Sequence, residues 1–186
     1  MKSQPVFEED KDLLQAFKIE SSKEWAFTQI VKKYQERLYW HIRRMVISHD
    51  DADDILQNVF IKVWRYLENF REEANLFTWL YRIATNETIT FLNKEKKRGS
   101  ISISDEDLGM ENVLKAEPGF DASEIEWKLQ MAIQQLPEKQ KIVFNLRYYD
   151  EMPYAEMSEV LETSIGALKA SYHHAVKKVE EYLKNN

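Results

Sequence analysis

Apolar side chains recur at steps of three and four residues between positions 25 and 46 of the chain. These side chains are Trp25, Phe27, Ile30, Val31, Tyr34, Leu38, Ile42, Met45 and Val46. That spacing places them along one face of an α-helix, with polar residues on the opposite face. We therefore predict an amphipathic helix whose apolar stripe is buried.

Two further helices are predicted in the first hundred residues. One starts at Ser48 or Asp50, either of which can cap it, and its acidic first turn suits the positive end of the helix dipole. The side chains predicted to be buried on it are Ile55, Val59, Phe60, Val63 and Leu67. The other runs from about Phe77 to Arg98 and ends in a basic cluster, which suits the negative end of a dipole. Its predicted inward-facing residues are Leu80, Ile83, Ala84 and Phe91.

Four more helices are predicted in the last third of the chain. They are expected at 124–136, 137–149, 154–161 and from 165 onward. Pro137 suits the first turn of the second of these helices, because proline has no amide hydrogen to leave unpaired there.

The last two of these helices have the pattern of a helix-turn-helix. About three residues join them, and Ser164 can cap the final helix. Leu161, Ile165 and Leu168 are expected to fill the space between the two helices. Ser158 is small where the helices would cross.

Between the two sets of helices the periodicity stops. Residues 99–123 contain three of the four glycines and no sustained helical period. Residues 101–123 hold one basic residue and six acidic residues. We predict a flexible acidic linker here, with one domain at 1–98 and a second at 124–186.

The composition favours a helical protein without thiol chemistry. With 44% hydrophobic and 12% aromatic residues but only four Gly and four Pro in 186 residues, the chain can fill packed cores and lacks the turns of a many-stranded fold. The absence of Cys excludes a disulfide framework, a thiolate metal site and a thiol nucleophile. No signal-peptide pattern and no membrane-length apolar run is found. We therefore expect a cytoplasmic protein without membrane insertion.

The net charge of −6 argues against strong stand-alone binding to nucleic acid, because phosphate binding depends on Lys and Arg. The acid excess lies largely in the middle of the chain, since residues 1–100 hold 17 Lys and Arg against 16 Asp and Glu. If the chain binds DNA, we expect it to do so beside a larger partner.

One helix face in the first domain is a candidate for protein binding. Asp54, Gln57, Asn58 and Ile61 share a mostly polar face that can make directed hydrogen bonds. An ordinary solvated face has the same spacing, so both interpretations stay open at this point.

A second region of this domain is a candidate for single-stranded nucleic acid. The polar segment NFREEANL precedes a helix face that carries Trp79, Arg82, Asn86 and Thr90. Bases stack on aromatic rings and phosphates pair with Arg, which suits such a surface. Aromatic residues at helical spacing are also typical of a buried core.

The chain contains, in order, the segments DDADDILQNVF and FTWLYRIATNETITFL, an acidic linker, and LPEKQKIVFNLRYYDEMPYAEMSEVLETSIGALKASYHHAVKK. This ordered set resembles extracytoplasmic-function sigma factors, particularly those of Bacteroidetes, over nearly the whole chain. The resemblance implies an all-α fold of two small helical domains, sigma region 2 and a sigma region 4 with a helix-turn-helix, joined by the linker. It also implies a subunit, with no catalytic activity, metal or cofactor, that binds core RNA polymerase and directs promoter-specific transcription initiation.

The resemblance assigns three binding surfaces by position. The residues implied to dock on the clamp helices of the polymerase β′ subunit are Asp54, Gln57, Asn58 and Ile61. Those implied to recognise and melt the −10 promoter element are Asn69, Arg71, Asn75, Trp79, Arg82 and Asn86. Those implied to recognise the −35 element are Ser164, Gly166, Lys169, Ala170, His173 and Lys177.

Further partners follow from the same resemblance. The polymerase β flap is an expected second contact, and the acidic linker is expected to thread toward the polymerase active site and RNA exit path. Relatives are commonly held inactive by an anti-sigma factor, often membrane-anchored, which covers their polymerase-binding surfaces. We expect such a partner here.

Two positions depart from the family pattern. Glu162 stands in the helix-helix turn where many relatives have Gly, and a non-Gly residue in the left-handed region costs about 1 kcal/mol. Ser171 stands where an Arg often follows, so bidentate guanine readout is not available from this helix. Lys169, Lys177 and Lys178 remain candidates for phosphate contact.

Three other functional classes are compatible with parts of the pattern. A helical protein-interaction adaptor would also explain net acidity and amphipathic helices. A conventional helix-turn-helix repressor is disfavoured, because the first domain shows neither a ligand pocket nor a dimerisation zipper. An enzyme is the weakest alternative, since the chain has no HExxH motif and no phosphate-cradling glycine loop. The four histidines of the chain also lack a metal-ligand arrangement with carboxylates. They are His41, His49, His173 and His174.

Overall fold

The computed structural model describes residues 9–46, 48–71, 75–98 and 124–185, and every regular element in these ranges is helical. The α-helices are α1 (Asp10–Phe17), α2 (Lys23–Arg43), α3 (His49–Tyr66), α4 (Leu76–Arg98), α6 (Glu124–Gln134), α7 (Glu138–Tyr148), α8 (Tyr154–Leu161) and α9 (Ile165–Asn185). Two short 3-10 turns lie at Glu20–Ser22 and Leu67–Asn69. The all-α fold class is confirmed for the described ranges. The predicted acidic linker at 99–123 lies outside them.

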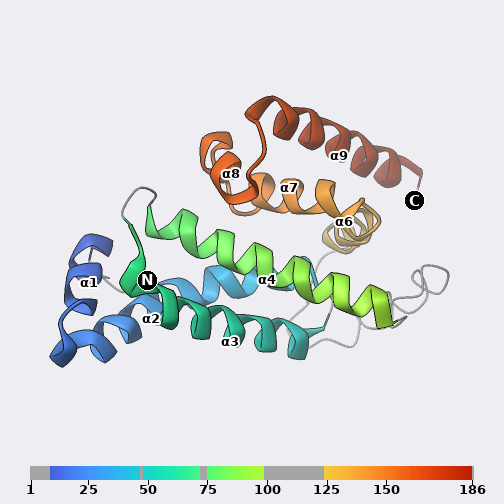
Figure 1. Cartoon of the computed structure of the whole chain (residues 1–186). Helices are drawn as coiled ribbons and strands as arrows, with labels where there is room; N and C mark the ends of the chain where they lie inside the picture. Colours follow the sequence, from blue (N-terminus) through green and yellow to red (C-terminus); the bar gives the residue numbers. More distant parts are fainter. Residues whose placement is uncertain (1–8, 47, 72–74, 99–123, 186) are drawn as a thin grey trace, which may run out of the picture.

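Helices α2, α3 and α4 pack side by side, and α1 packs on α2 at one end of this group (Figure 1). Helices α6 to α9 form a second group, in which α6, α7 and α8 all contact α9. The second group lies on α4, mainly through α8 (Figure 1). Helix α4 therefore makes the main helix contact between the two halves of the chain.

The apolar stripe predicted on α2 forms the centre of the first half. Ile30, Leu38 and Ile42 are completely buried, and α2 packs on α3 and α4. Trp25 is an exception, because it is 45% exposed, and its predicted burial is wrong. Ala26 and Ile30 occupy the inward positions in the first turns of α2, which leaves Trp25 facing outward.

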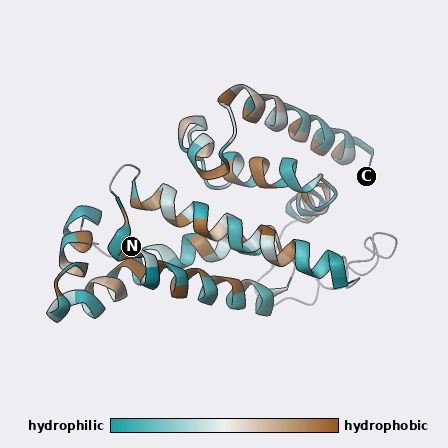
Figure 2. Cartoon of the chain, viewed as in Figure 1, coloured by the Kyte–Doolittle hydropathy of each residue, from teal (hydrophilic) through white to brown (hydrophobic). Residues whose placement is uncertain are grey.

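Side-chain caps set the starts of α3 and α4. The Asp51 amide donates to Ser48 Oγ at 3.2 Å, which confirms Ser48 as the cap of α3. The Thr78 amide donates to Asn75 Oδ1 at 2.7 Å in the same way at the start of α4. Of the side chains predicted to face inward, the buried ones are Ile55, Val59, Val63, Leu67, Leu80 and Ala84, and the half-buried ones are Phe60, Ile83 and Phe91. Figure 2 shows the pattern as hydrophobic positions recurring between hydrophilic ones along the helices.

The helix-turn-helix consists of α8, a three-residue turn and α9. Glu162 takes a left-handed backbone there, with φ 50° and ψ 41°, so this turn carries the steric cost of a non-Gly residue. Ser158 Oγ donates to the Thr163 carbonyl at 2.7 Å and ties the turn to α8. Ser164 Oγ accepts from the Ala167 amide at 3.3 Å, which confirms Ser164 as the cap of α9.

The packing between α8 and α9 is only partly as predicted. Leu168 is buried and Leu161 is half-buried, as expected. Ile165 is 42% exposed, so its predicted burial is wrong. It is the first residue of α9 and lies between two exposed neighbours, outside the contact that Leu168 makes one turn later.

The apolar core is continuous across the two halves. Its members from α7 to α9 and the connecting turn are Ile142, Val143, Leu146, Met152, Met157, Val160 and Leu168. A separate cluster joins the end of α6 and α7 to the rest of α9, and its buried members are Ala132, Ile133, Leu136, Phe144, Ala175 and Val179. The two predicted domains are thus packed on one another, a placement for which the sequence pattern made no prediction.

Glu151, in the turn before α8, tests the cost of a left-handed non-Gly residue. Its φ is 52° and it is exposed. We expect Glu151→Gly to raise the free energy of unfolding by about 1 kcal/mol, because glycine adopts a positive φ without steric penalty. The matched control Glu159→Gly, at an exposed position within α8, should lower it by about 1 kcal/mol. Urea unfolding followed by circular dichroism measures both, and a destabilising Glu151→Gly would contradict the interpretation.

Candidate functional site

The outer face of α3 carries the four residues predicted to dock on polymerase. Asp54, Gln57, Asn58 and Ile61 are all exposed, whereas the adjacent stripe of the same helix is buried against α2 and α4. Ile61 is 42% exposed, so the face presents an apolar side chain among amide and carboxylate groups. A face of this kind can offer hydrogen bonds around an apolar contact.

A hollow of about 440 Å³ lies beside this face, between the start of α3 and the end of α4. Asp51 and Asp54 line it from α3, and Lys94 and Arg98 line it from α4. Burial raises the pKa of the Asp51 carboxyl, and the nearby Glu95 carboxylate raises it further. Acidic side chains of α3 and basic side chains of α4 therefore lie on opposite sides of this hollow.

The start of α4 is organised around Asn75. Its Oδ1 accepts from both the amide and the hydroxyl of Thr78, each at 2.7 Å, so this oxygen is committed to capping the helix. Trp79 is half-buried, and its ring lies 5.0 Å from the ring of Phe70. Trp79 therefore supports the chain before α4 and presents only part of its ring to solvent.

The other residues predicted to read the −10 element lie on the surface before α4 and along its first three turns. Asn69, Arg71 and Asn86 are exposed. Arg82 is exposed as well, but its guanidinium forms an ion pair with Glu162 in the turn of the helix-turn-helix. One predicted −10 residue is therefore in contact with the second half of the chain.

The N-terminal part of α9 presents the third predicted surface. Its predicted residues are all exposed: Ser164, Gly166, Lys169, Ala170, His173 and Lys177. The Lys169 ammonium lies 5.7 Å from the centroid of the Tyr154 ring. A Cβ at Gly166 would meet nothing within 4 Å, so the fold itself does not require glycine there. Glycine at this position does allow a partner backbone to approach closely.

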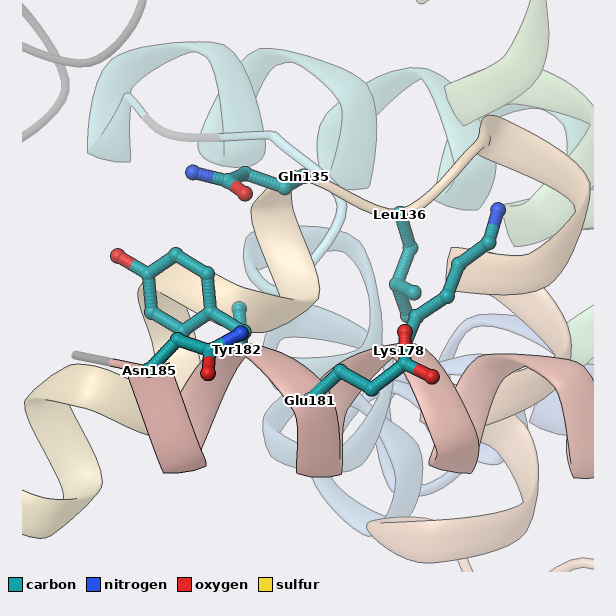
Figure 3. Close-up of a pocket in the computed structure, with 7 residues that line it drawn as sticks. Gln135, Leu136, Lys178, Glu181, Tyr182 and Asn185 are labelled. Atoms are coloured by element: carbon teal, nitrogen blue, oxygen red, sulfur yellow. The ribbon is translucent and has the colours of Figure 1, made fainter.

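Lys178 does not belong to this surface. Nine residues separate it from Lys169, which at about 100° per residue turns it to the opposite side of the helix. It lines a hollow of about 290 Å³ between α6 and α9, together with Glu181 and Tyr182 (Figure 3). Lys178 therefore does not share a face with Lys169, and its contact with phosphate stays a prediction.

A buried polar cluster between the two halves was not predicted from the sequence. Asp150 lies in the turn between α7 and α8, and its side chain is 6% exposed. Its Oδ2 lies 3.0 Å from His41 Nδ1, and its Oδ1 accepts from the Tyr81 hydroxyl at 3.2 Å and from the Arg44 guanidinium at 3.5 Å. All three partners belong to the first half. We call these four residues the Asp150 clasp.

The clasp is hydrogen-bonded on all sides. A carboxylate can only accept, so His41 Nδ1 carries the proton toward Asp150, and His41 Nε2 lies 3.0 Å from the Thr85 hydroxyl. Burial raises the pKa of Tyr81 well above its usual value, and the Asp150 charge raises it further, so the hydroxyl keeps the proton that it donates. One signal was visible in the sequence, because His41 stands inside the apolar stripe of α2.

Two family profiles match the chain. The profile for Sigma-70 region 2 matches residues 30–98, and the profile for Sigma-70, region 4 matches residues 126–179. Over 168 residues the chain is 30% identical to the ECF RNA polymerase sigma factor SigW of Bacillus subtilis, which covers 86% of this chain and 90% of that protein. The chain belongs to the extracytoplasmic-function (ECF) sigma factors. It directs promoter-specific initiation of transcription by RNA polymerase.

Two solved structures share the fold of this sigma factor. The structure of CnrH in complex with the cytosolic domain of CnrY has a TM-score of 0.69 at 22% identity, and the match covers 95% of this chain and 98% of CnrH. The sigma factor RpoE of Bartonella quintana, in complex with the anti-sigma factor NepR, has a TM-score of 0.66 at 23% identity over 85% of this chain and 96% of RpoE.

Within the described ranges, no helix of this sigma factor is long and apolar enough to cross a membrane. Among the same residues, no group of three or more His, Asp or Glu side chains is placed to hold a metal ion.

Asn75 provides a test of its role as the cap of α4. We expect Asn75→Ala to lower the free energy of unfolding of the sigma factor by about 1 kcal/mol, because the Thr78 amide loses its acceptor. Asn75→Asp keeps a carboxylate oxygen in the same place and should retain the stability. Urea unfolding measures the difference. Equal destabilisation by both substitutions would show that capping is not what Asn75 contributes.

Proposed function

We propose that the exposed stripe of α3, formed by Asp54, Gln57, Asn58 and Ile61, is the surface with which this sigma factor binds core polymerase, on the clamp helices of the β′ subunit. Support comes from its exposure: all four side chains are accessible while the two halves are packed together. Docking through this surface therefore needs no prior rearrangement of the chain. An isoleucine among hydrogen-bonding groups gains free energy when a partner covers it.

The −10 site in this proposal is the start of α4 with the chain that precedes it. Asn69 and Arg71 are exposed in the chain before α4, and Asn86 is exposed about two turns after the half-buried Trp79 on the same helix. Taking a base out of the stack costs a few kcal/mol, and stacking on an aromatic side chain returns about 1–3 kcal/mol per base. Hydrogen bonds from the flanking amides can supply the remainder, so strand opening needs binding energy alone and no covalent step.

The −35 site in this proposal is the exposed face of α9. Lys169 and Lys177 supply phosphate contacts, and Gly166 lets the helix start approach the DNA backbone. Ala170 and His173 lie between them and can reach base edges, where an alanine methyl group suits the methyl of thymine. Affinity from so few cations is modest, so polymerase must hold the sigma factor on DNA.

The proposed functional units are 1–98 and 124–186, slightly longer than the matched regions. Helix α1 lies outside the matched range, yet Leu13, Leu14 and Phe17 are buried in the same core as α2. An anti-sigma factor is the proposed regulatory partner. The likeness to the fold of RpoE, which was solved with the anti-sigma factor NepR, supports it.

The α3 proposal is tested by two adjacent aspartates that point in different directions. Asp54→Lys should weaken binding to core polymerase by about 1 kcal/mol or more, because it reverses a charge inside the proposed contact. Asp53→Lys makes the same charge change about 100° away around the helix and should have little effect. Titration of fluorescently labelled sigma factor with core polymerase measures both affinities. A similar loss in the two variants would point to net charge and against a defined surface.

The α9 proposal is tested by two lysines of the same helix. Lys169→Ala should weaken holoenzyme binding to a −35-containing duplex and reduce the salt dependence by about one counterion, because one phosphate contact is lost. Lys184→Ala, an exposed lysine in the last turn of α9, should change neither quantity. Filter binding at several salt concentrations gives both slopes. If Lys169→Ala leaves the slope unchanged, α9 does not contact DNA in the proposed way.

A further inference from the structure

Two adjacent histidines lie on the exposed part of α9. His173 and His174 are both exposed, and their ring centroids are 5.9 Å apart. His173 belongs to the surface proposed to face the −35 element, and His174 follows it about 100° further around the helix. The other two histidines of the chain are in the first half, where His41 is completely buried and His49 is the first residue of α3. DNA bound along α9 can therefore reach the His173–His174 pair and no other histidine of this helix.

The pair lies among lysines. Residues four apart are neighbours on a helix surface, so His173 lies between Lys169 and Lys177. The carboxylate of Glu181 lies 4.0 Å from the Lys177 ammonium, one turn further along α9. Among the described residues, neither His173 nor His174 forms an ion pair with a carboxylate.

The helices packed on α9 do not change this picture. The titratable groups that α7 and α8 bring to this part of α9 lie around the hydroxyl of Tyr172, the residue before His173. These groups are Arg147, Tyr148 and Tyr154. The α6 side of the hollow between α6 and α9 is lined by uncharged side chains. In the part of the chain that the structure describes, no carboxylate is thus paired with a protonated ring of the pair, and a bound polyanion can supply that partner.

Duplex DNA is a partner that favours the charged form of imidazole. It carries one negative charge per about 1.7 Å of helix axis, and guanine presents N7 and O6 acceptors in the major groove. A neutral imidazole has one N–H donor, whereas a protonated imidazole has two donors and a positive charge. Histidine changes its charge between about pH 5 and pH 8. Contact between the pair and DNA can therefore be coupled to the uptake of a proton near neutral pH.

We propose that binding of the −35 element takes up a proton at the His173–His174 pair, and that the protonated pair contacts hydrogen-bond acceptors of the DNA as an additional cation. This inference rests on the proposed function of α9. The proton comes from solvent and is bound by a ring nitrogen, and no covalent bond of the DNA changes. Because the complex then holds more protons than the free partners, affinity is greatest at the acidic end of the range and falls as the pH rises.

Holoenzyme binding to a −35-containing duplex between about pH 6 and pH 8 tests the coupling. The affinity should rise by about threefold to tenfold as the pH falls, since one proton permits at most about a tenfold change per pH unit. Replacing both rings, by His173→Gln with His174→Gln, should remove this rise, because glutamine donates a hydrogen bond and does not titrate. The matched control is His49→Gln, an exposed histidine of the first half, which should keep the rise. Fluorescence anisotropy of labelled duplex measures all three affinities.

Proton uptake can also be counted directly. Titration calorimetry near pH 7 in two buffers of different ionisation enthalpy gives the number of protons bound with the duplex. The unsubstituted holoenzyme should take up more protons than the double variant, and circular dichroism checks that the variant keeps its helix content. Equal proton uptake and equal pH dependence in the two proteins would overturn the proposal.

Salt titrations and base changes distinguish the two kinds of acceptor. If DNA phosphates accept, the double substitution should lower the salt slope by about 0.9 at the acidic end and leave it unchanged at the alkaline end. If guanine accepts, the slope should stay the same and the loss should disappear when that guanine is replaced. Either result supports the proposal, because the ring is protonated in both.

Failure of this inference can be told apart from failure of the proposed function. A holoenzyme that binds duplexes with and without a −35 element equally at every pH would contradict the proposed role of α9. A holoenzyme that prefers the −35 duplex, with the same pH dependence in the double variant, would contradict proton uptake alone.

Discussion

A carboxylate buried between two bodies must be paired, because an isolated charge in such a place costs several kcal/mol. Asp150 meets that requirement with donors drawn entirely from the first half of the chain. Its position fixes where the second half can sit: the turn that carries Asp150 leads directly into α8, and α8 then lies on α4. The Asp150 pairing and the apolar core that continues between the halves therefore set the register of the helix-turn-helix together.

Each helix that carries a proposed binding surface has a buried stripe and an exposed stripe with separate tasks. On α3 the buried side builds the core with α2 and α4, and the other side stays open along its length. On α9 Leu168, Ala175 and Val179 face inward and the predicted DNA-reading residues face solvent. This separation lets surface residues change with the promoter or the partner while the packing stays the same.

The sequence predicted most of the local structure because helix periodicity and caps are local properties. Ser48 and Ser164 cap the helices that they were expected to cap. The errors at Trp25 and Ile165 are both at helix starts, where one turn of neighbours is missing and periodicity alone assigns the wrong face. The Asp150 clasp could not be predicted, because its partners are 69 to 109 residues away and the packing of the halves decides which of them meet.

Glu162 holds the turn of the helix-turn-helix in a left-handed conformation that glycine would adopt without strain. A glutamate codon becomes a glycine codon by one base change, so an unstrained turn is a single mutation away. The exposed ion pair with Arg82 contributes about 0–1 kcal/mol, which does not exceed the steric cost of the left-handed residue. Glu162 therefore brings no net gain in folding stability over glycine at this position. Glu162 instead joins the turn of the helix-turn-helix to Arg82 on α4.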